Sequence, residues 1–145
     1  MNYSFGLLKP DCLERGLVEQ AFGLIEKQGL RIVFQKKHRL SIQDVFFLYQ
    51  RCIGKEFFGI MTDFLTSNDS LLYVVVSETE IDVPKLLNHI VGETNPTKAE
   101  PNTLRSLGES ICRNIAHSAE NHEVFLREVG HFLNKEERIR IGLDV

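Results

Sequence analysis

Residues 71–76 constrain the fold of this chain more than any other stretch. They read Leu-Leu-Tyr-Val-Val-Val, and such β-branched and aromatic residues favour a strand. A strand that is apolar on both faces is usually covered on both faces, so we expect it at the centre of a sheet. The remaining segments must then supply the neighbouring strands and the helices that pack on them.

Three further strands are predicted from apolar stretches bounded by turn residues. Pro10 ends the first of them, because proline restricts the backbone and cannot donate a ladder hydrogen bond. In the second, Leu30, Ile32 and Phe34 alternate and are expected to share one face. The three strands are placed at residues 4–8, 30–37 and 111–116.

Helices are predicted between the strands from apolar residues three and four positions apart. Ser41 is a good N-cap, with Asp44 three positions further on as in a capping box. Gly29 suits the C′ position that ends the first helix. The predicted helices lie at residues 13–28, 41–52, 57–65, 82–90 and 103–108, followed by one through Phe125, Val129 and Phe132 and by a charged tail from Asn134 that frays or forms a short helix.

The predicted order of elements is β-α-β-(α-α)-β-α-β-α, which becomes β-α-β-β-α-β when the extra helical pair is set aside. This is the split βαβ, or ferredoxin-like, pattern. We therefore expect an α+β sandwich in which a four-stranded antiparallel sheet carries its helices on one face, while the other face also needs cover, which a subunit partner could supply. A chain of 145 residues fits a single domain, placed at residues 1–145.

Composition and charge argue against several classes of protein. The net charge of −3 speaks against the broad basic surface that binds nucleic acids, so no specific nucleic-acid partner is expected. No apolar stretch approaches the length that spans a bilayer, and the first residues do not resemble a signal peptide, so we expect a cytoplasmic protein. The three cysteines, Cys12, Cys52 and Cys112, are widely spaced, which favours reduced thiols.

His117 is the candidate for chemistry among the histidines because of its neighbours in the sequence. It follows the fourth predicted strand, with Asn114 three residues before it and Arg105 twelve before it. A neutral imidazole with one nitrogen held by a partner presents the other nitrogen as a nucleophile near pH 7. Glu128, on the last helix, is either a solvated glutamate or the acceptor that orients this imidazole. An ordinary hydrogen-bonded histidine at a strand end is the alternative.

Four further residues have both a structural and a chemical interpretation. Lys9 either extends past the edge of the core into solvent or supplies a point charge for phosphate oxygens. Arg105 is either an exposed helical residue or a forked phosphate donor, and Thr94 either caps a turn or donates its hydroxyl to phosphate. Phe57 is either a core residue or a ring at a cleft mouth that stacks on a base. The Walker phosphate loop and the zinc-ligand spacings are absent from the sequence.

In combination, these segments resemble the nucleoside diphosphate kinase family over nearly the whole chain, from about Phe5 to Leu133. The segments that carry the resemblance are Lys9-Pro10-Asp11, Arg15-Gly16-Leu17-Val18, Gly29-Leu30-Arg31-Ile32-Val33, Tyr49, Phe57-Phe58, Gly92-Glu93-Thr94-Asn95-Pro96, Asn102-Thr103-Leu104-Arg105, Asn114-Ile115-Ala116-His117 and Arg127-Glu128.

The resemblance implies a kinase that moves the γ-phosphoryl group of a nucleoside triphosphate to a nucleoside diphosphate in two half-reactions, through a phosphohistidine on His117. The residues implied in catalysis are His117, Glu128, Lys9 and Tyr49. Those implied in nucleotide binding are Lys9, Thr94 and Arg105 at the phosphates, Asn114 at the sugar and Phe57 at the base. Mg²⁺ is expected to enter bridging the phosphates rather than bound by protein ligands. A homo-oligomer, most commonly a hexamer, is also implied.

Two positions depart from the family pattern, and the stretch from Asn68 to Leu87 needs a few extra residues to align with it. The family usually follows its histidine with Gly-Ser-Asp, whereas this chain has Ser118-Ala119-Glu120, so the family's serine is Ala119. Losing one hydrogen bond to a charged group costs about 1.5–3 kcal/mol, which slows an enzyme without abolishing its activity. A phosphate-binding arginine is replaced by Asn88, with His89 or Lys85 as candidates to compensate. These departures motivate the alternative of a weak or inactive nucleotide-binding relative with a regulatory or scaffolding role.

Overall fold

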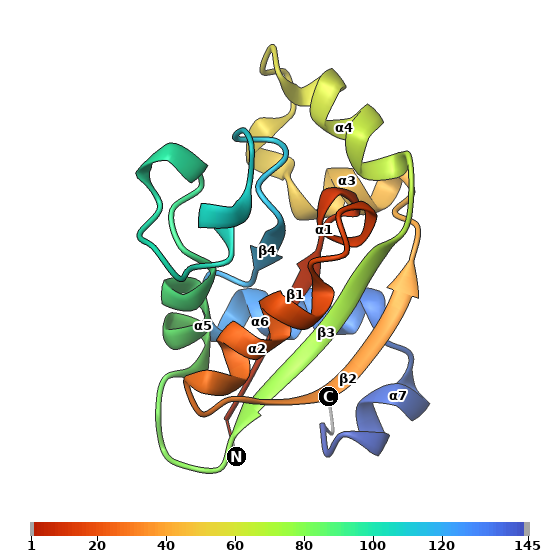
Figure 1. Cartoon of the computed structure of the whole chain (residues 1–145). Helices are drawn as coiled ribbons and strands as arrows, with labels where there is room; N and C mark the ends of the chain where they lie inside the picture. Colours follow the sequence, from red (N-terminus) through yellow and green to blue (C-terminus); the bar gives the residue numbers. More distant parts are fainter. Residues whose placement is uncertain (1, 144–145) are drawn as a thin grey trace.

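The computed structural model describes residues 2–143, and its centre is a four-stranded antiparallel sheet (Figure 1). The strands lie in the order β2-β3-β1-β4. They span β1 (Asn2–Leu8), β2 (Arg31–His38), β3 (Ser70–Ser77) and β4 (Ala116–Ser118). β3 is buried along its whole length between β2 and β1, as its apolar sequence predicts. The strand order and pairing confirm the predicted ferredoxin-like α+β fold.

The predicted helices form in the predicted order, although the first is divided in two and η2 is an additional short helix. They are α1 (Pro10–Glu14), α2 (Val18–Lys27), α3 (Ile42–Leu48), η1 (Gln50–Cys52), α4 (Phe58–Thr66), α5 (Val83–Val91), η2 (Pro96–Lys98), η3 (Arg105–Leu107), α6 (His122–Phe132) and α7 (Lys135–Arg140), where η marks a 3-10 helix. The first predicted helix is divided in two because Gly16, with a φ of 67°, turns the chain between α1 and α2. Within residues 2–143, no helix is both long and apolar enough to cross a membrane.

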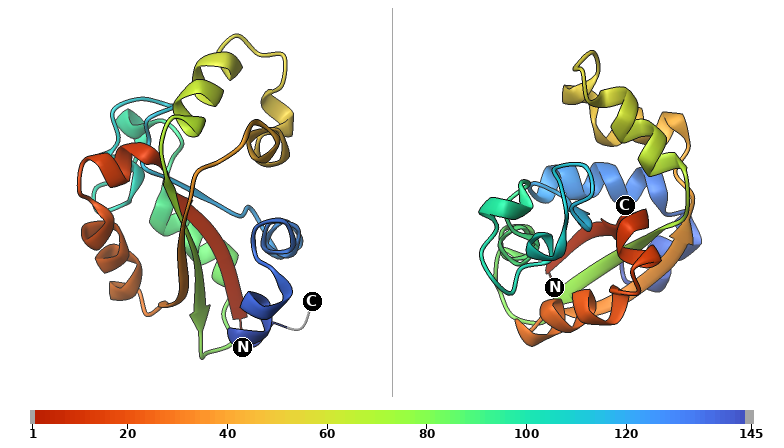
Figure 2. Two further views of the ribbon diagram at one scale, coloured as in Figure 1. Left: turned by 90° about the vertical axis from the view of Figure 1, so that its right-hand side faces the viewer. Right: turned by 45° about the horizontal axis from the view of Figure 1, so that its top comes forward.

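Helices cover both faces of the sheet, which corrects the prediction that they cover only one. Tyr73 and Val75 of β3 belong to a core shared with α2 and α5. Leu72 and Val74, on the opposite face of the same strand, belong to a second core that includes Phe125 of α6. Figure 2 shows the sheet with α2 on one side and α6 and α7 on the other. The last helices of the chain itself thus provide the cover that was expected from a subunit partner.

A β-bulge in β2 changes which of its residues share a face. Ile32 pairs with Val75 and Phe34 pairs with Val74, so Val33 is an extra residue in the ladder. Ile32 accordingly packs against the first core, whereas Phe34 packs against the second. The prediction that Phe34 shares a face with the alternate residues before it is therefore wrong.

At one end of the sheet, α3, η1 and α4 form a helical cap with a third, smaller core (Figure 1). α3 begins at the predicted capping box: the Asp44 N–H donates to the Ser41 hydroxyl at 3.0 Å, and the Ser41 N–H donates to the Asp44 carboxylate at 2.9 Å. The side chains of this third core are Leu40, Val45, Met61, Phe64 and Leu65. The cap carries Tyr49 and Phe57, so its attachment to the sheet decides where these two rings lie.

The fourth strand is much shorter than predicted. Only Ala116–Ser118 pairs with β1, and residues 111–115 form an irregular loop. Ile115 has a φ of 78°, which is incompatible with extended strand geometry. The strand predicted over residues 111–116 is therefore wrong except at its last residue.

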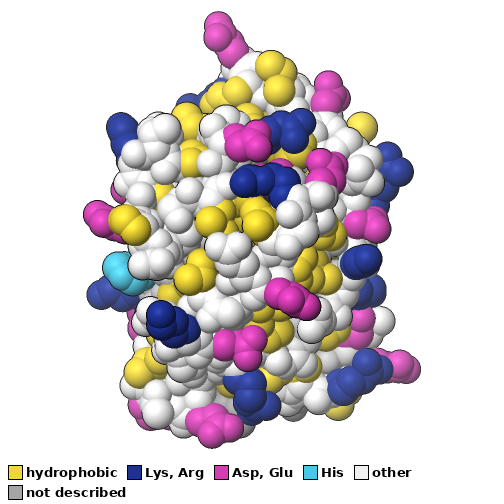
Figure 3. All heavy atoms as spheres, viewed as in Figure 1, with side chains coloured by type: hydrophobic (Ala, Val, Ile, Leu, Met, Phe, Trp, Pro, Cys, Tyr) yellow, Lys and Arg dark blue, Asp and Glu magenta, His cyan; other side chains and the backbone are white. Residues whose placement is uncertain are grey.

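The molecular face that carries α1 and α2 shows acidic and basic side chains interspersed, with apolar side chains between them (Figure 3). This mixture agrees with the small net charge of −3. The face therefore has no broad field of one sign of charge.

Candidate active site

β4 and α6 bring His117 and Glu128 together. The Nε2 atom of His117 lies 3.2 and 3.1 Å from the two carboxylate oxygens of Glu128. Both side chains are shielded from solvent, with 13% of the histidine side chain and 5% of the glutamate side chain exposed. A carboxylate can only accept from a neutral imidazole, so Nε2 carries the hydrogen and Nδ1 keeps a free lone pair. The pair therefore has the geometry of an oriented nucleophile.

Tyr49, at the C-terminal end of α3, contacts the imidazole edge-on. Its ring centroid lies 5.6 Å from that of His117. Its hydroxyl is buried and has no hydrogen-bond partner among the described residues. Burial raises the pKa of Tyr49, so the phenol stays protonated and can donate. A buried donor without a partner costs free energy unless a ligand satisfies it.

Lys9 is buried at the start of α1 rather than extended into solvent. Its Nζ donates to Asn114 Oδ1 at 2.7 Å and lies 5.7 Å from the centroid of the Tyr49 ring. Burial, with a smaller contribution from the nearby Arg105 guanidinium, lowers the pKa of Lys9 to about 8. Among the described residues, no carboxylate forms an ion pair with this ammonium. Because its pKa lies close to neutral pH, a bound anion would stabilise its charged form.

Arg105 and Asn114 connect the loops around this lysine. Arg105 donates from Nε to the Ala116 carbonyl at 3.2 Å and from Nη1 to the Gly92 carbonyl at 2.9 Å. Asn114 donates from Nδ2 to the Thr94 carbonyl at 2.8 Å. Burial lowers the pKa of Arg105, which nevertheless remains a cation near neutral pH. The Thr94 side chain is exposed, so its hydroxyl is accessible to a ligand.

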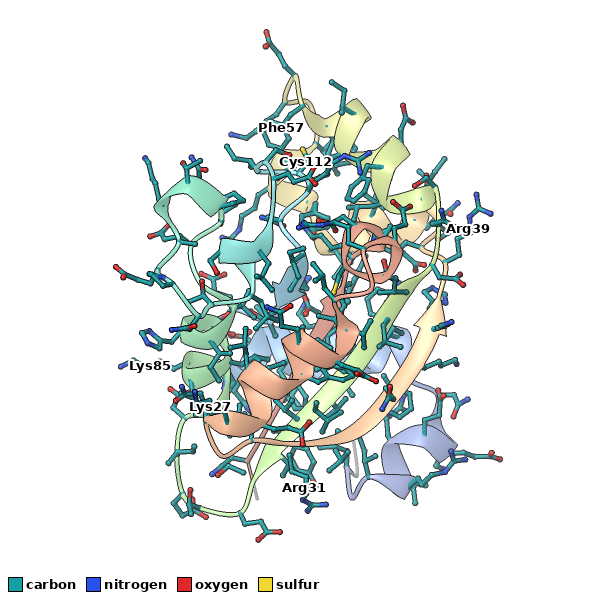
Figure 4. The ribbon with its side chains drawn as sticks, viewed as in Figure 1. Lys27, Arg31, Arg39, Phe57, Lys85 and Cys112 are labelled. Atoms are coloured by element: carbon teal, nitrogen blue, oxygen red, sulfur yellow. The ribbon has the colours of Figure 1, made fainter. Side chains whose placement is uncertain are left out.

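Phe57 lies at the start of α4 with 39% of its surface exposed. Figure 4 shows Phe57 and Cys112 at the same end of the molecule, on the cap and on the loop before β4. α4 contacts this loop directly, since the Arg113 guanidinium lies 4.4 Å from the centroid of the Phe64 ring. An exposed ring at this rim suits stacking on a flat ligand.

A cavity of about 230 Å³ opens beside the histidine. Tyr49, His117 and Glu128 line it, together with two cations, Arg51 and Arg127. Arg51 could not be predicted from the sequence, where it is only a charge in a polar stretch. The cavity is not lined by Lys9, Arg105 or Asn114. These residues lie next to it, because Lys9 contacts the ring of Tyr49, which is part of the cavity wall.

The two departures from the family pattern are bonded to each other. The Ser118 hydroxyl donates to Asn88 Oδ1 at 2.6 Å, and Asn88 Nδ2 donates to the Glu120 carbonyl at 2.8 Å. Ala119 is fully buried, and its N–H donates to the Phe5 carbonyl at 2.9 Å. The hydrogen of the Ser118 hydroxyl is therefore bound by Asn88 and is not free to replace the serine of the family pattern. Neither candidate to compensate for the missing arginine, His89 or Lys85, lines the cavity, and Lys85 projects outward from α5 (Figure 4).

These features define a class of protein: a ferredoxin-like α+β fold in which a buried carboxylate contacts a histidine beside a cavity, with two arginines on the cavity wall and a buried lysine nearby. Comparison with known proteins makes the class specific. The family model described as nucleoside diphosphate kinase matches residues 2–138. A nucleoside diphosphate kinase of Rickettsia akari is 35% identical over 141 residues, which cover 96% of this chain and 98% of the relative.

A nucleoside diphosphate kinase of Desulforamulus reducens is 34% identical over 140 residues, covering 96% of this chain and 92% of the relative. The crystal structure of the apo enzyme from Encephalitozoon cuniculi superposes with a TM-score of 0.85 at 25% identity, covering 94% of this chain and 92% of that one. The chain belongs to the nucleoside diphosphate kinase family. The family and enzyme class expected from the sequence are confirmed.

Proposed function

We propose that this protein transfers the γ-phosphoryl group of a nucleoside triphosphate to a nucleoside diphosphate by a ping-pong mechanism, with Nδ1 of His117 as the carrier. The observation that supports this most directly is the contact of the Glu128 carboxylate with Nε2 at 3.1 and 3.2 Å. It leaves the other ring nitrogen as the nucleophile. Maintenance of nucleotide pools would be the cellular consequence.

In the first half-reaction, the Nδ1 lone pair attacks the γ-phosphorus. The N–P bond forms while the bond from the γ-phosphorus to the bridging oxygen breaks, and its electron pair leaves with the nucleoside diphosphate. Nε2 keeps its hydrogen, and Glu128 stabilises the positive charge that the phosphorylated ring gains. In the second half-reaction, a terminal phosphate oxygen of a different nucleoside diphosphate attacks the phosphohistidine. The histidine nitrogen then leaves with its lone pair restored.

The charges around the histidine suit positioning and neutralising a polyphosphate, which is most of what phosphoryl transfer requires. Lys9 and Arg105 would bind phosphate oxygens, and the Thr94 hydroxyl would donate to another. The unpartnered Tyr49 hydroxyl would donate to the phosphoryl group or to its neighbours. Each of these groups is buried or held by backbone bonds except Thr94, so little ordering remains to be done when the nucleotide binds.

Asn114 and Phe57 would contact the nucleoside. Asn114 is held between Lys9 Nζ and the Thr94 carbonyl, which places an amide beside the phosphate-binding lysine, where the sugar would follow. Phe57 would stack on the base at the rim. A stacked ring recognises the flat face of any base, so broad tolerance of nucleotides is expected.

Mg²⁺ would enter with the nucleotide. In the described part of the chain, no three His, Cys, Asp or Glu side chains come together as a possible metal site. The ion would be held by the nucleotide phosphates and by water, so no dedicated protein site would be needed for it. Its chemical contribution is to neutralise the charge that develops on the phosphate oxygens.

Assembly into a homo-oligomer, with a hexamer as the commonest form in the family, belongs to the same proposal. β2 is an edge strand of the sheet, and an unpaired edge is a surface where a second copy can pair. Size-exclusion chromatography with light scattering would measure the oligomeric state.

The cytoplasmic location stays a prediction.

The test is the intact mass of the protein after brief incubation with Mg-ATP, with His117→Ala as the matched control. We expect the wild type alone to gain one phosphoryl group and to lose it again when GDP is added. Gain of the group by both proteins would move the chemistry to another residue. No gain in either protein, with nucleotide binding intact, would instead support the weak or inactive relative that Ala119 and the Ser118–Asn88 bond suggest.

A further inference from the structure

The residues just before the histidine form a rare turn. The Ala116 N–H donates to the Asn114 carbonyl at 2.9 Å, and Ile115 between them has a φ of 78°. A bond across three residues with positive φ at the centre is the strained form of the γ-turn. Isoleucine is poorly suited to it, since a β-branched side chain crowds the backbone there. Such strain persists only where the surrounding structure holds it.

The surrounding structure comes from the other end of the chain. The Ile115 N–H donates to Asp11 Oδ2 at 3.1 Å, across 104 positions in sequence. The Ile115 carbonyl accepts from the Lys9 N–H at 2.7 Å. Both polar backbone groups of the strained residue are thus bound by Lys9, which follows β1, and by Asp11 in the first turn of α1. Ile115 itself is fully buried, so water cannot replace these partners.

Asp11 is an unusual residue to find in this place. Only 3% of its surface is exposed, and its Oδ1 atom has no hydrogen-bond partner among the described residues. Burial raises the pKa of Asp11, while the Ile115 N–H and the Lys9 charge act in the opposite direction. A buried carboxylate with one unsatisfied oxygen is costly, and a neutral residue would fit the core better. The hydrogen bond from the Ile115 N–H is the contact that joins this carboxylate to a distant part of the chain.

The position of the turn connects it to the chemistry. β4 begins at the next residue and contains only three residues, with His117 paired opposite Leu7 of β1. So short a strand does little to fix its own register. The turn sets the angle at which the chain enters it. If Ile115 relaxed to a negative φ, Ala116 and His117 would shift relative to Glu128.

We infer that Asp11 is a positioning residue: its carboxylate holds Ile115 in the strained turn and so fixes the His117 imidazole between Glu128 and the nucleotide cleft. This rests on the proposed function of His117. Lys9 and Asp11 then have separate roles within one motif, with Lys9 facing the nucleotide and Asp11 facing the backbone of the histidine loop. Sequence analysis singled out the motif but gave Asp11 no role.

The test is the rate at which His117 is phosphorylated in a single turnover with Mg-ATP, measured beside the affinity for ADP. Misplacing a reactive group by about 1 Å can cost on the order of 100-fold in rate. We therefore expect Asp11→Ala to slow phosphorylation by about 10- to 100-fold while ADP affinity changes less. Asp11→Asn keeps the volume and an acceptor oxygen and is expected to restore most of the rate.

Asp82→Ala is the matched control, because Asp82 also accepts from a backbone N–H, that of Lys85 at 3.1 Å, but at the start of α5. It should phosphorylate at the wild-type rate. If Asp11→Ala does not fold, Asp11→Ser takes its place, since its hydroxyl is one bond shorter than the carboxylate.

Three results would overturn the inference: a wild-type rate in Asp11→Ala or its serine replacement, an equal loss in Asp82→Ala, or an equal loss in Asp11→Asn. The last would assign the effect to charge near Lys9 rather than to the turn. A wild-type protein that is never phosphorylated would instead refute the proposed function.

Discussion

At the scale of single residues, the site depends on buried polar groups whose partners lie far away in sequence. We predicted roles for His117, Glu128, Lys9 and Asn114 from the sequence, and in the structure these residues form two contacts, at 3.1 Å between His117 and Glu128 and at 2.7 Å between Lys9 and Asn114. Roles for Asp11 and Arg51 could not be predicted, because neither the strained backbone at Ile115 nor the cavity wall leaves a local pattern. Residue types in the sequence suggest which side chains could take part in chemistry, but the sequence does not show which of them are buried together.

Glu128→Gln tests whether the carboxylate orients the histidine. The amide removes the charge that stabilises the phosphorylated ring and can donate to Nε2, which favours the wrong tautomer. We expect the rate of His117 phosphorylation to fall by about 100-fold. Glu123→Gln, in the exposed first turn of the same helix, is the control and should leave the rate unchanged. A Glu128→Gln enzyme as fast as the wild type would remove Glu128 from the mechanism.

The pKa of Lys9, lowered to about 8, predicts a pH dependence of nucleotide capture. In the free enzyme the ammonium loses its proton as pH rises through about 8, so kcat/KM should fall there. Bound phosphates favour the charged form, so the fall in kcat should come at higher pH. Initial-rate profiles between pH 6 and 10, limits chosen as about two units around that pKa, would measure both. A kcat/KM that stays flat across this range would contradict the assignment.

The lowered pKa of Lys9 also affects stability, but here the free energy of unfolding rises with pH where kcat/KM falls. Below pH 8 Lys9 is protonated in both the folded and the unfolded state. Between a pH of about 8 and the ordinary lysine pKa of 10.5, the unfolded state binds more protons than the folded state. The contribution of Lys9 to the free energy of unfolding therefore increases with pH in this range. Lys9 therefore opposes folding most at neutral pH and below, where the folded state must bury a charged ammonium.

At the scale of helices and strands, local patterns predicted which elements form but not where some of them end. The capping box at Ser41 and the apolar run of β3 were predicted correctly, because both depend on neighbouring residues. β4 was predicted too long, because the apolar pattern of residues 111–116 is overridden by a turn that Asp11 holds from 104 positions away. The bulge at Val33 likewise depends on pairing with β3 rather than on β2 alone.

Asp44 joins three elements through one carboxylate and provides a test at this scale. It accepts from the Ser41 N–H, from His38 at the end of β2 at 2.8 Å and from His131 on α6 at 2.8 Å. Asp44→Ala removes a helix cap and two further bonds, so we expect a loss of about 2–3 kcal/mol in the free energy of unfolding. Urea denaturation measures it, with the exposed Asp69→Ala as control.

Because this anchor holds the cap that carries Tyr49, the loss should also weaken ADP binding. A variant with unchanged ADP affinity despite the expected loss of stability would show that the cap is held in place by its apolar core alone.

At the scale of the whole molecule, the sheet is enclosed between two layers of helices, and the site lies where its short edge strand meets the cap. The sequence predicted the ferredoxin-like order correctly but placed all helices on one face. The apolar spacing of Phe125 and Val129 shows that one side of α6 is buried, yet it carries no information on which face of the sheet receives that side. Only the assembled fold places Glu128 beside His117. The proposal that Nδ1 of His117 carries the phosphoryl group depends on this arrangement.

The most direct test of that claim is which imidazole nitrogen carries the phosphoryl group. Protein labelled with ¹⁵N-histidine, phosphorylated by Mg-ATP and studied by ³¹P and ¹⁵N NMR at alkaline pH, would identify the nitrogen by its coupling to phosphorus. Because Glu128 holds Nε2, we expect phosphorus on Nδ1 of His117 and on no other histidine. Phosphorus on Nε2, or on any other residue, would contradict it.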